Sequence, residues 1–156
     1  MPTTSKREQF LDQVLLRLAA ITVANGFNTD AGEEGHLGEA PEFGPDDATS
    51  HIRVVVEDDE VGPHQAKLFV GLPISIHAIA PVTTAMTLGR AYRDAERVLA
   101  DIKRAMELPD RTFDGLVKDL GIVRGSTRTL PRDPGAQFVG VSIEYRAPMH
   151  ETWGAP

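Results

Sequence analysis

The alternation of apolar with other residues between Leu68 and Ala78 is the feature that most constrains the fold. The apolar members of this run are Leu68, Val70, Leu72, Ile74, Ile76 and Ala78, and the residues between them are Phe69, Gly71, Pro73, Ser75 and His77. Because successive side chains of a strand point to opposite faces, this period of two predicts a half-buried strand with His77 on its outward face. Pro73 cannot donate a ladder hydrogen bond, which suggests an edge position or a bulge.

An amphipathic helix is predicted near the N-terminus. Ser5 and Glu8 form an S-x-x-E capping box, which is typical of a helix start. The apolar residues that follow at helical spacing on one face are Leu11, Val14, Leu15, Leu18 and Ile21. The pattern predicts a helix from about Lys6 to Ala24, ended by Asn25-Gly26.

A second helical stripe follows Pro81 and consists of Ala91, Ala95, Val98, Leu99, Ile102, Ala105 and Met106. This helix is expected to stop at Leu108, because Pro109 disfavours a helical conformation in the residue before it. Off the stripe, three ion pairs at i,i+4 spacing are expected to add only tenths of a kcal/mol each. They are Arg90 with Asp94, Arg97 with Asp101, and Lys103 with Glu107.

Three more strands are predicted from runs of β-branched and apolar residues. They are Ile52 to Val56, about Leu120 to Leu130, and Phe138 to Arg146. The connector 131–135 has the proline, aspartate and glycine content of a hairpin tip, and a short helical turn is expected around Phe113 to Lys118.

The order helix, two strands, long helix, two strands predicts an α+β fold: a mainly antiparallel sheet of about four strands with two helices packed on one face. A chain of 156 residues fits a single domain covering residues 1–156. Within it we expect a long acidic loop at residues 31–50 and a flexible C-terminal tail at residues 149–156.

The charge of the chain is divided unevenly along the sequence. The net charge is -7, which argues against a protein that grips nucleic acid through its phosphates. Between Leu18 and Ala66 there are eleven acidic residues and one basic residue, Arg53, so this stretch carries -10 and the rest of the chain +3. Cysteine is absent, which removes disulfides and thiolate sites, and no apolar leader or membrane-spanning stretch is visible. We therefore expect a protein that is made and kept in the cytosol unless it leaves inside a particle.

No residue constellation in the sequence indicates an enzyme, a cofactor or a metal site. The five histidines are His36, His51, His64, His77 and His150, and no two of them have the spacing that directs two imidazoles at one metal. The acidic run Glu57, Asp58, Asp59 and Glu60 lacks the spacing of a calcium loop, and we interpret it as a solvated hairpin tip that blunts edge pairing. Serine elbows and phosphate-binding glycine loops are missing. A small metal-dependent or ligand-dependent α+β enzyme, with a site that spacing does not reveal, is the alternative from another class.

Several segments of the chain resemble the tail terminator family of long-tailed bacteriophages, also called tail completion or minor tail proteins. The N-terminal helix leading to Phe27-Asn28-Thr29-Asp30-Ala31-Gly32 looks like the start of these proteins. The helix Ala91 to Met106, with Asp101-Ile102-Lys103-Arg104-Ala105, resembles their long helix, and Val139-Gly140-Val141-Ser142-Ile143-Glu144-Tyr145-Arg146 resembles their final strand. The acidic loop and the tail with Trp153 match no motif of the family.

The resemblance implies a structural virion protein without cofactor. It would form a ring, expected to be a hexamer, that caps the tail tube, ends tube polymerisation and offers a docking surface to the head or neck. Its partners would be further copies of itself, the major tail tube protein and a neck protein, with DNA only as passing cargo and no membrane. It would be assembled in the host cytoplasm and found in the virion tail. A head-completion or neck connector protein is the alternative within assembly proteins.

A head-to-tail ring places two different surfaces of one chain against each other, and the charge asymmetry suggests which they are. The candidate basic surface is formed by Arg124, Arg128 and Arg132, and the candidate acidic one by the stretch from Glu33 to Glu60, with Glu57, Asp58, Asp59 and Glu60 at its end. The candidate apolar contacts are Phe43, Phe69 and Phe138. Alternatively the arginines are ordinary solvated charges. A second hypothesis is that some of the acids line a channel for DNA and repel its phosphates.

Overall fold

The computed structural model describes residues 4–33, 35–38, 50–64, 67–81, 88–129 and 138–152. The helices are α1 (Lys6–Ala19) and α2 (Leu88–Glu107), with two short 3-10 turns, η1 (Val23–Asn25) and η2 (Ala31–Glu33). The strands are β1 (Gly35–Leu37), β2 (His51–Val56), β3 (Glu60–His64), β4 (Lys67–Pro81), β5 (Val123–Thr129) and β6 (Phe138–Thr152). These elements confirm the predicted α+β class.

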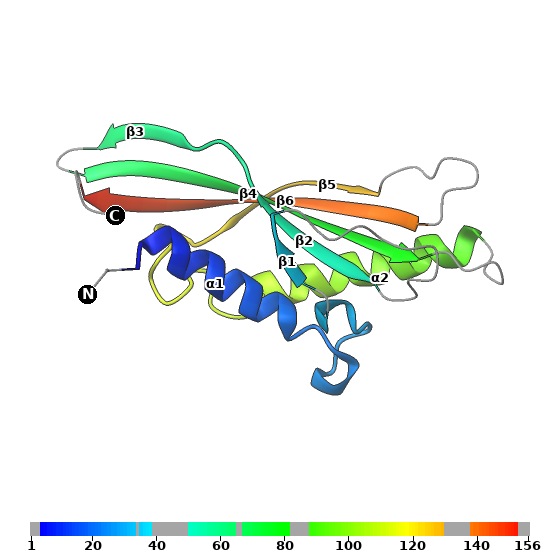
Figure 1. Cartoon of the computed structure of the whole chain (residues 1–156). Helices are drawn as coiled ribbons and strands as arrows, with labels where there is room; N and C mark the ends of the chain where they lie inside the picture. Colours follow the sequence, from blue (N-terminus) through cyan, green and yellow to red (C-terminus); the bar gives the residue numbers. More distant parts are fainter. Residues whose placement is uncertain are drawn as a thin grey trace.

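The sheet is organised around the long antiparallel pair β4 and β6. These strands pair over their whole length, from Lys67 opposite Thr152 to Pro81 opposite Phe138. The strand order is β1-β2-β4-β6-β5, and β3 pairs with β4 beyond the end of β2 (Figure 1). All of these pairings are antiparallel except that of β1 with β2. The sheet therefore has six strands rather than about four.

The alternation of the sequence decides which face of the sheet is covered. The apolar members of the run in β4 are buried where their side chains are described, and so are Val139, Val141, Ile143 and Tyr145 of β6. Both helices lie on this face of the sheet, and their buried stripes join the same core (Figure 1). Phe10 of α1 meets Phe113 edge to face, with ring centroids 4.8 Å apart. Because the apolar residues of the strands recur with a period of two, the core lies on one side of the sheet only.

The two strands that the sequence did not predict lie in its acidic part. The chain 31–50 was expected to be a loop, but residues 35–37 form β1 beside β2, while residues 39–49 lie outside the described part. The run Glu57 to Glu60 is not a hairpin tip. It joins β2 to β3, and both of these strands pair with the same edge of β4. β3 reads Glu-Val-Gly-Pro-His, which has no alternation to mark it as a strand.

The segment after α2 is not a short right-handed helical turn, as predicted for residues 113–118. Phe113, Asp114 and Gly115 have φ angles of 51°, 55° and 80°, which is the left-handed region. The turn is held by hydrogen bonds that Thr112 N–H and Asp114 N–H donate to the carboxylate of Asp110, at 2.9 and 2.8 Å. Side chain to backbone bonds of this kind favour turns over helix.

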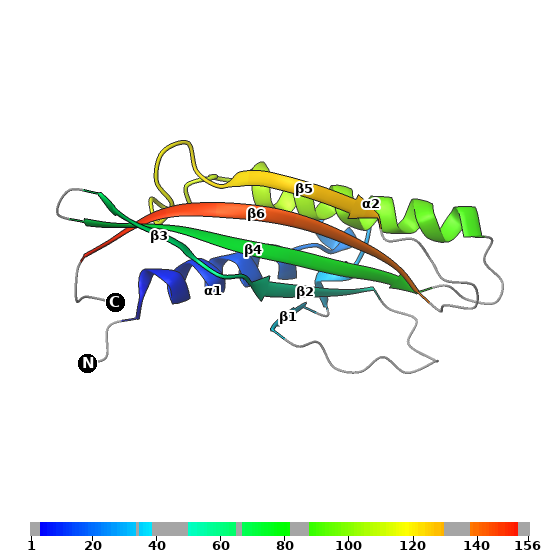
Figure 2. The same ribbon diagram turned by 90° about the horizontal axis from the view of Figure 1, so that it is seen from above.

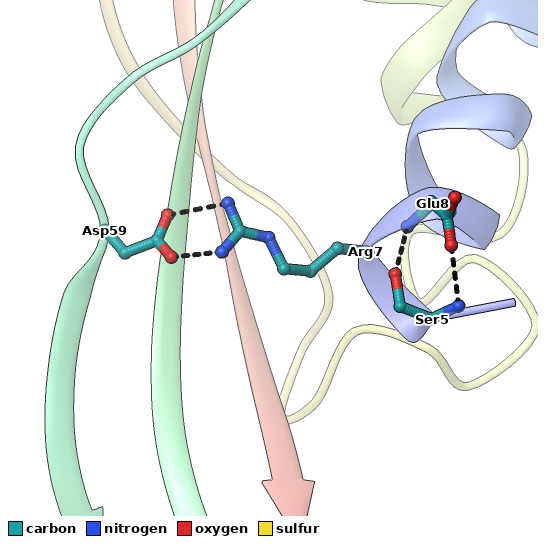
Figure 3. A network of polar contacts seen from close by, with 4 residues as sticks. All are labelled: Ser5, Arg7, Glu8 and Asp59. Carbon is teal, nitrogen blue, oxygen red and sulfur yellow. Dashed lines mark hydrogen bonds and ion pairs between the residues drawn. The ribbon is translucent and has the colours of Figure 1, made fainter. Parts of the chain in front are cut away.

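The predicted capping box of α1 is confirmed: Glu8 N–H donates to Ser5 Oγ at 3.1 Å, and Ser5 N–H donates to Glu8 Oε2 at 2.9 Å (Figure 3). The helix ends at Ala19, five residues before the predicted end, and the chain then turns through η1. At the other end of the chain, β6 continues to Thr152, so the expected tail from Met149 begins within a strand. Neither helix described here is long and apolar enough to cross a membrane.

Asp101 holds the turn between η1 and η2 against α2. Its side chain is fully buried, and its carboxylate accepts hydrogen bonds from Asn28 N–H at 3.1 Å, from Asn28 Nδ2 at 2.8 Å and from Thr29 Oγ1 at 2.8 Å. The predicted surface pair of Arg97 with Asp101 is therefore wrong. Arg97 instead pairs with Asp94 at 3.0 Å. A buried carboxylate needs such donors, because burial without them costs several kcal/mol.

We predict that Asp101→Ala lowers the free energy of unfolding by about 2 to 3 kcal/mol, because it removes the acceptor for three donor groups around a buried site. Asp94→Ala is the matched control on the same helix, since it removes only the exposed pair with Arg97 and should cost less than about 1 kcal/mol. Urea unfolding of both variants measures the difference. Equal losses of unfolding free energy in the two variants would show that the hydrogen bonds to buried Asp101 stabilise the fold no more than an exposed ion pair does.

Candidate docking surface

The face of the sheet turned away from α1 and α2 is called the outer face here. Figure 2 looks onto it, with β5, β6, β4 and β2 side by side and no helix in front of them. Its central residues are Arg53 and Val55 of β2, Glu57 directly after β2, Pro73, Ser75 and His77 of β4, Ser142, Glu144 and Arg146 of β6, and Arg128 of β5. In the part of the chain that the structure describes, no helix or strand covers this face.

Strand register arranges these side chains in rows across the sheet. Arg53 lies opposite His77, His77 opposite Ser142, and Ser142 opposite Arg128, which makes one polar row across four strands. The next row joins Val55, Ser75 and Glu144. Side chains directly opposite each other on one face lie within contact distance, so each row is a continuous strip of surface.

A groove of about 450 Å³ crosses the outer face beside these rows. It is lined by Glu57 directly after β2, by Pro73 and Ser75 of β4, and by Glu144 and Arg146 of β6. Its far wall is the start of β5, where a Cβ on Gly125 would lie 3.4 Å from Glu144 Oε2. The groove is open and carries charges of both signs, which suits a polar protein surface better than an enclosed apolar ligand.

His77 is the half-buried imidazole at the centre of the first row. Burial lowers its pKa below the ordinary value, and the neighbouring guanidinium of Arg53 lowers it further, while Glu57 and Glu144 oppose the shift. The imidazole is therefore neutral at pH 7. Arg53, Glu57 and Glu144 all lie close enough to act on it, which places these three charges around one point of the outer face.

Four charged groups on this face have no ion-pair partner within the described chain. Two are cations, Arg53 and Arg128, and two are carboxylates, Glu57 and Glu144. Each lies at a surface position where the described residues supply no ion pair. Such charges are available to a partner, where they set register and orientation more than affinity.

Two charged contacts on the helix side of the sheet join it to the helices. Arg7 of α1 forms a two-point contact with Asp59, of which the Nη2 to Oδ1 distance is 3.1 Å (Figure 3). Glu107 of α2 lies 3.5 Å from Arg124 and accepts a hydrogen bond at 2.8 Å from the hydroxyl of Tyr145, whose pKa is raised by burial. These pairs tie the sheet to its helices.

The three predicted interface arginines do not form one surface. Arg124 faces the helices, where it meets Glu107, and Arg128 lies on the outer face opposite Ser142. The cause is a bulge between Arg124 and Thr127, which inverts the alternation partway along β5. Arg132 lies outside the described residues.

The predicted acids and aromatic residues are also separated. Asp59 is used by Arg7, Glu57 and Asp58 are exposed, and Glu60 begins β3 opposite Gly71. The predicted aromatic contacts are Phe43, Phe69 and Phe138. Phe69 is half-buried and lies edge-on to His150 with ring centroids 6.0 Å apart, Phe138 is half-buried at the start of β6, and Phe43 is outside the described part.

The described edges of the sheet are poorly suited to pairing with another strand. β5 is interrupted by its bulge and carries two arginines, β1 has three residues, and β3 contains Pro63, which lacks an N–H group. Bulges, charges, proline and short strands are the devices by which proteins block edge pairing. Of the described surfaces of the sheet, the outer face rather than an edge is therefore open to contact.

Sequence reasoning missed Arg53 and Glu144 as candidate site residues. Both occupy outward positions of predicted strands, so the period of two was a sufficient signal for their exposure. It did not indicate that they share a face with Arg128, because that depends on strand order and on the bulge in β5. Among the described residues, no group of three His, Asp or Glu side chains lies close enough together to hold a metal ion.

Comparisons with known proteins identify no family. No protein-family model matches the sequence, and no curated protein matches it. Among solved structures, the chain is similar to the core region of PilO from the type IV pilus system of Pseudomonas aeruginosa, with a TM-score of 0.30 and 16% sequence identity. The match covers 63% of this chain and 79% of the PilO chain. A likeness at this TM-score establishes neither a shared fold nor a shared activity.

The predicted membership of the phage tail terminator family is wrong. No family model supports it, and the PilO core region, a solved structure to which the chain is similar, belongs to a pilus system rather than to a phage tail. The tube-capping function, the head-completion alternative and the virion localisation depended on that resemblance and are withdrawn with it. The expectation that tail tube and neck proteins are partners depended on the same resemblance and is withdrawn as well. Self-association is a separate expectation, because it depends on the surface of this chain alone.

We predict that His77→Gln reduces the loss of stability that the protein shows as the pH falls below about 6.5. The pKa of His77 is lowered in the folded state, so below about pH 6.5 the unfolded chain binds more protons at this residue than the folded protein does. The stability that neutral His77 contributes is present above that pH and is lost as the pH falls toward the lowered pKa. Thermal unfolding between about pH 7.5 and 5 measures the effect.

Ser142→Asn, directly opposite His77, is the matched control for this measurement, because it changes the same row without removing a titrating group. It should keep the slope of the parent protein. If His77→Gln loses melting temperature toward acid as steeply as the parent does, the lowered pKa of His77 plays no part in stability.

Proposed function

We propose that this chain is a non-enzymatic assembly protein that binds another protein chain through the outer face of its sheet. The observation that carries the proposal is the one-sided cover of the sheet. Two helices cover one face, and the described chain leaves the other without a helix or strand over it (Figures 1 and 2).

The chemistry of the outer face supports binding rather than catalysis. Ser75 and His77 point to the same side of β4, but no hydrogen bond joins them or connects either to a carboxylate in the described part. A nucleophilic serine needs a base within hydrogen-bond distance, and that base needs a third group to orient it. The arrangement lacks both contacts.

The charge pattern supports a protein partner. Ion pairs on the helix side are internal, whereas Arg53, Arg128, Glu57 and Glu144 on the outer face are not paired within the described chain. A nucleic acid would be repelled by the two carboxylates and by the net charge of -7. A protein surface can match charges of both signs in one contact.

Site-specific photo-crosslinking in the cell that produces the chain tests this proposal. We expect a photoreactive residue at Ser142, at the centre of the outer face, to form a covalent adduct with a protein that mass spectrometry identifies. A residue of the same kind at Ala100, exposed on the far side of α2, is the matched control and should give no adduct.

The adduct at Ser142 should also decrease when Arg53→Glu is introduced in the same chain, because the variant changes the charge of the same row without touching the labelled position. An adduct only at Ala100, or none at Ser142 at any expression level, contradicts the proposed function.

A further inference from the structure

We infer that the helix side of the protein holds a second binding site, a pocket for a small organic carboxylate with an apolar body. The pocket lies between the C-terminal ends of α1 and α2, away from the outer face, so the inference goes beyond the proposed function. It rests on an apolar pocket to which each helix contributes one arginine that has no ion pair in the described chain.

The pocket has a volume of about 270 Å³ and a mainly apolar lining. The apolar residues are Ala20 directly after α1, Phe27 between η1 and η2, and Ala105, Leu108 and Pro109 at the end of α2. Leu108 is 75% exposed, so the mouth of the pocket presents apolar surface to water that a ligand would cover. A cavity of about 150 Å³ accepts benzene, so this pocket has room for a six-membered ring with a short side chain.

Arg17 of α1 is held at one side of the pocket by three contacts. Its Nη2 donates to the carbonyl oxygen of Asp110 at 2.6 Å, and its Nη1 donates to that of Met106 at 3.4 Å. Its guanidinium carbon lies 3.7 Å from the centroid of the Phe113 ring. Burial lowers the pKa of Arg17, and Asp110 and Asp114 oppose this shift, but a guanidinium stays protonated at neutral pH. The pocket therefore has a fixed positive charge at this side.

Arg104 of α2 is held in a similar way at the other side of the pocket. Its Nη1 donates to the carbonyl oxygen of Gly26 at 2.6 Å, and its guanidinium carbon lies 4.8 Å from the centroid of the Phe27 ring. A guanidinium has five N–H groups. The contacts described use one of these groups on Arg104 and two on Arg17, so both arginines keep donors for a ligand.

A carboxylate is the group that these arginines suit best. The planar guanidinium can donate two parallel hydrogen bonds to a carboxylate, and side chains that are already held lose little conformational entropy on binding. Asp110, which follows Pro109, does not fill this role, because its carboxylate accepts hydrogen bonds from Thr112 N–H and Asp114 N–H at 2.9 and 2.8 Å.

The apolar lining adds the second requirement. An inorganic anion would leave the apolar surface of the pocket exposed to water, and a neutral apolar molecule would leave the arginines without an acceptor. A ligand that carries both a carboxylate and an apolar body satisfies both parts of the pocket.

Titration of the full chain with 3-phenylpropionate, followed in the amide NMR spectrum, tests the inference. We expect saturable shifts at Ala20, Phe27, Ala105 and Leu108, with a dissociation constant of roughly 1 mM for a ligand of this size. The alcohol 3-phenylpropan-1-ol lacks the carboxylate, and acetate lacks the apolar body. Each should bind at least about tenfold more weakly than 3-phenylpropionate.

Two variants with matched controls locate the ligand. Ala20→Leu fills the pocket and should weaken binding of 3-phenylpropionate at least about fivefold, whereas Ala19→Leu, at the neighbouring exposed position outside the pocket, should not. Arg104→Gln should lower the affinity for 3-phenylpropionate to that for the alcohol. Arg97→Gln, which removes an arginine of the same helix that does not line this pocket, should leave it unchanged.

Circular dichroism checks that each variant is folded, and the Ala20→Leu comparison decides if Arg104→Gln does not fold. The inference is overturned by equal affinity for the carboxylate and the alcohol, by unchanged affinity in Ala20→Leu, or by shifts that do not saturate at about 20 mM probe. Such a failure leaves the proposed function in place, because crosslinking at Ser142 reports on the outer face and not on this pocket.

Discussion

The full-length antiparallel pairing of β4 with β6 is the constraint on which the rest of the structure depends. Each strand has 15 residues, and the pairing keeps the alternation of both in phase from end to end. One face of the pair is therefore apolar throughout and must be covered, which α1 and α2 do. The other face inherits every polar residue of the alternation, and it is the surface from which the function is proposed.

The division between the two faces extends to the charged residues. On the helix side, Arg7 meets Asp59, and Arg124 meets Glu107, so charge there holds the sheet to the helices. On the outer face, Arg53, Arg128, Glu57 and Glu144 lack such partners in the described chain. Both cases occur in the short connection between β2 and β3. There Asp59 forms an ion pair with Arg7 of α1, whereas Glu57 lines the groove on the outer face. The alternation of the strands thus separates the charges that are paired within the chain from those that line the outer groove.

Periodicity predicted the α+β class, both helices, the strands that carry the core and the outward position of His77. It failed where structure depends on contacts distant in sequence. β3 has no pattern of its own and forms because β4 extends beyond β2 and offers it an edge. Asp101 looked like a surface residue and is instead buried by Asn28 and Thr29. The bulge in β5 separated Arg124 from Arg128, and the family resemblance, the least physical of the arguments, also proved wrong.

The most direct test of the account compares the amide NMR spectrum of the full chain inside the cell that produces it with the spectrum in dilute buffer. If the outer face is the surface that binds another protein, the signals that shift or broaden in the cell should cluster in the centres of β2, β4 and β6, around Val55, Ser75 and Ser142. Amides of the exposed side of α2, around Ala100, should keep their shifts. Changes confined to α2, or the same spectrum in both conditions, would contradict the proposal that this face binds a partner.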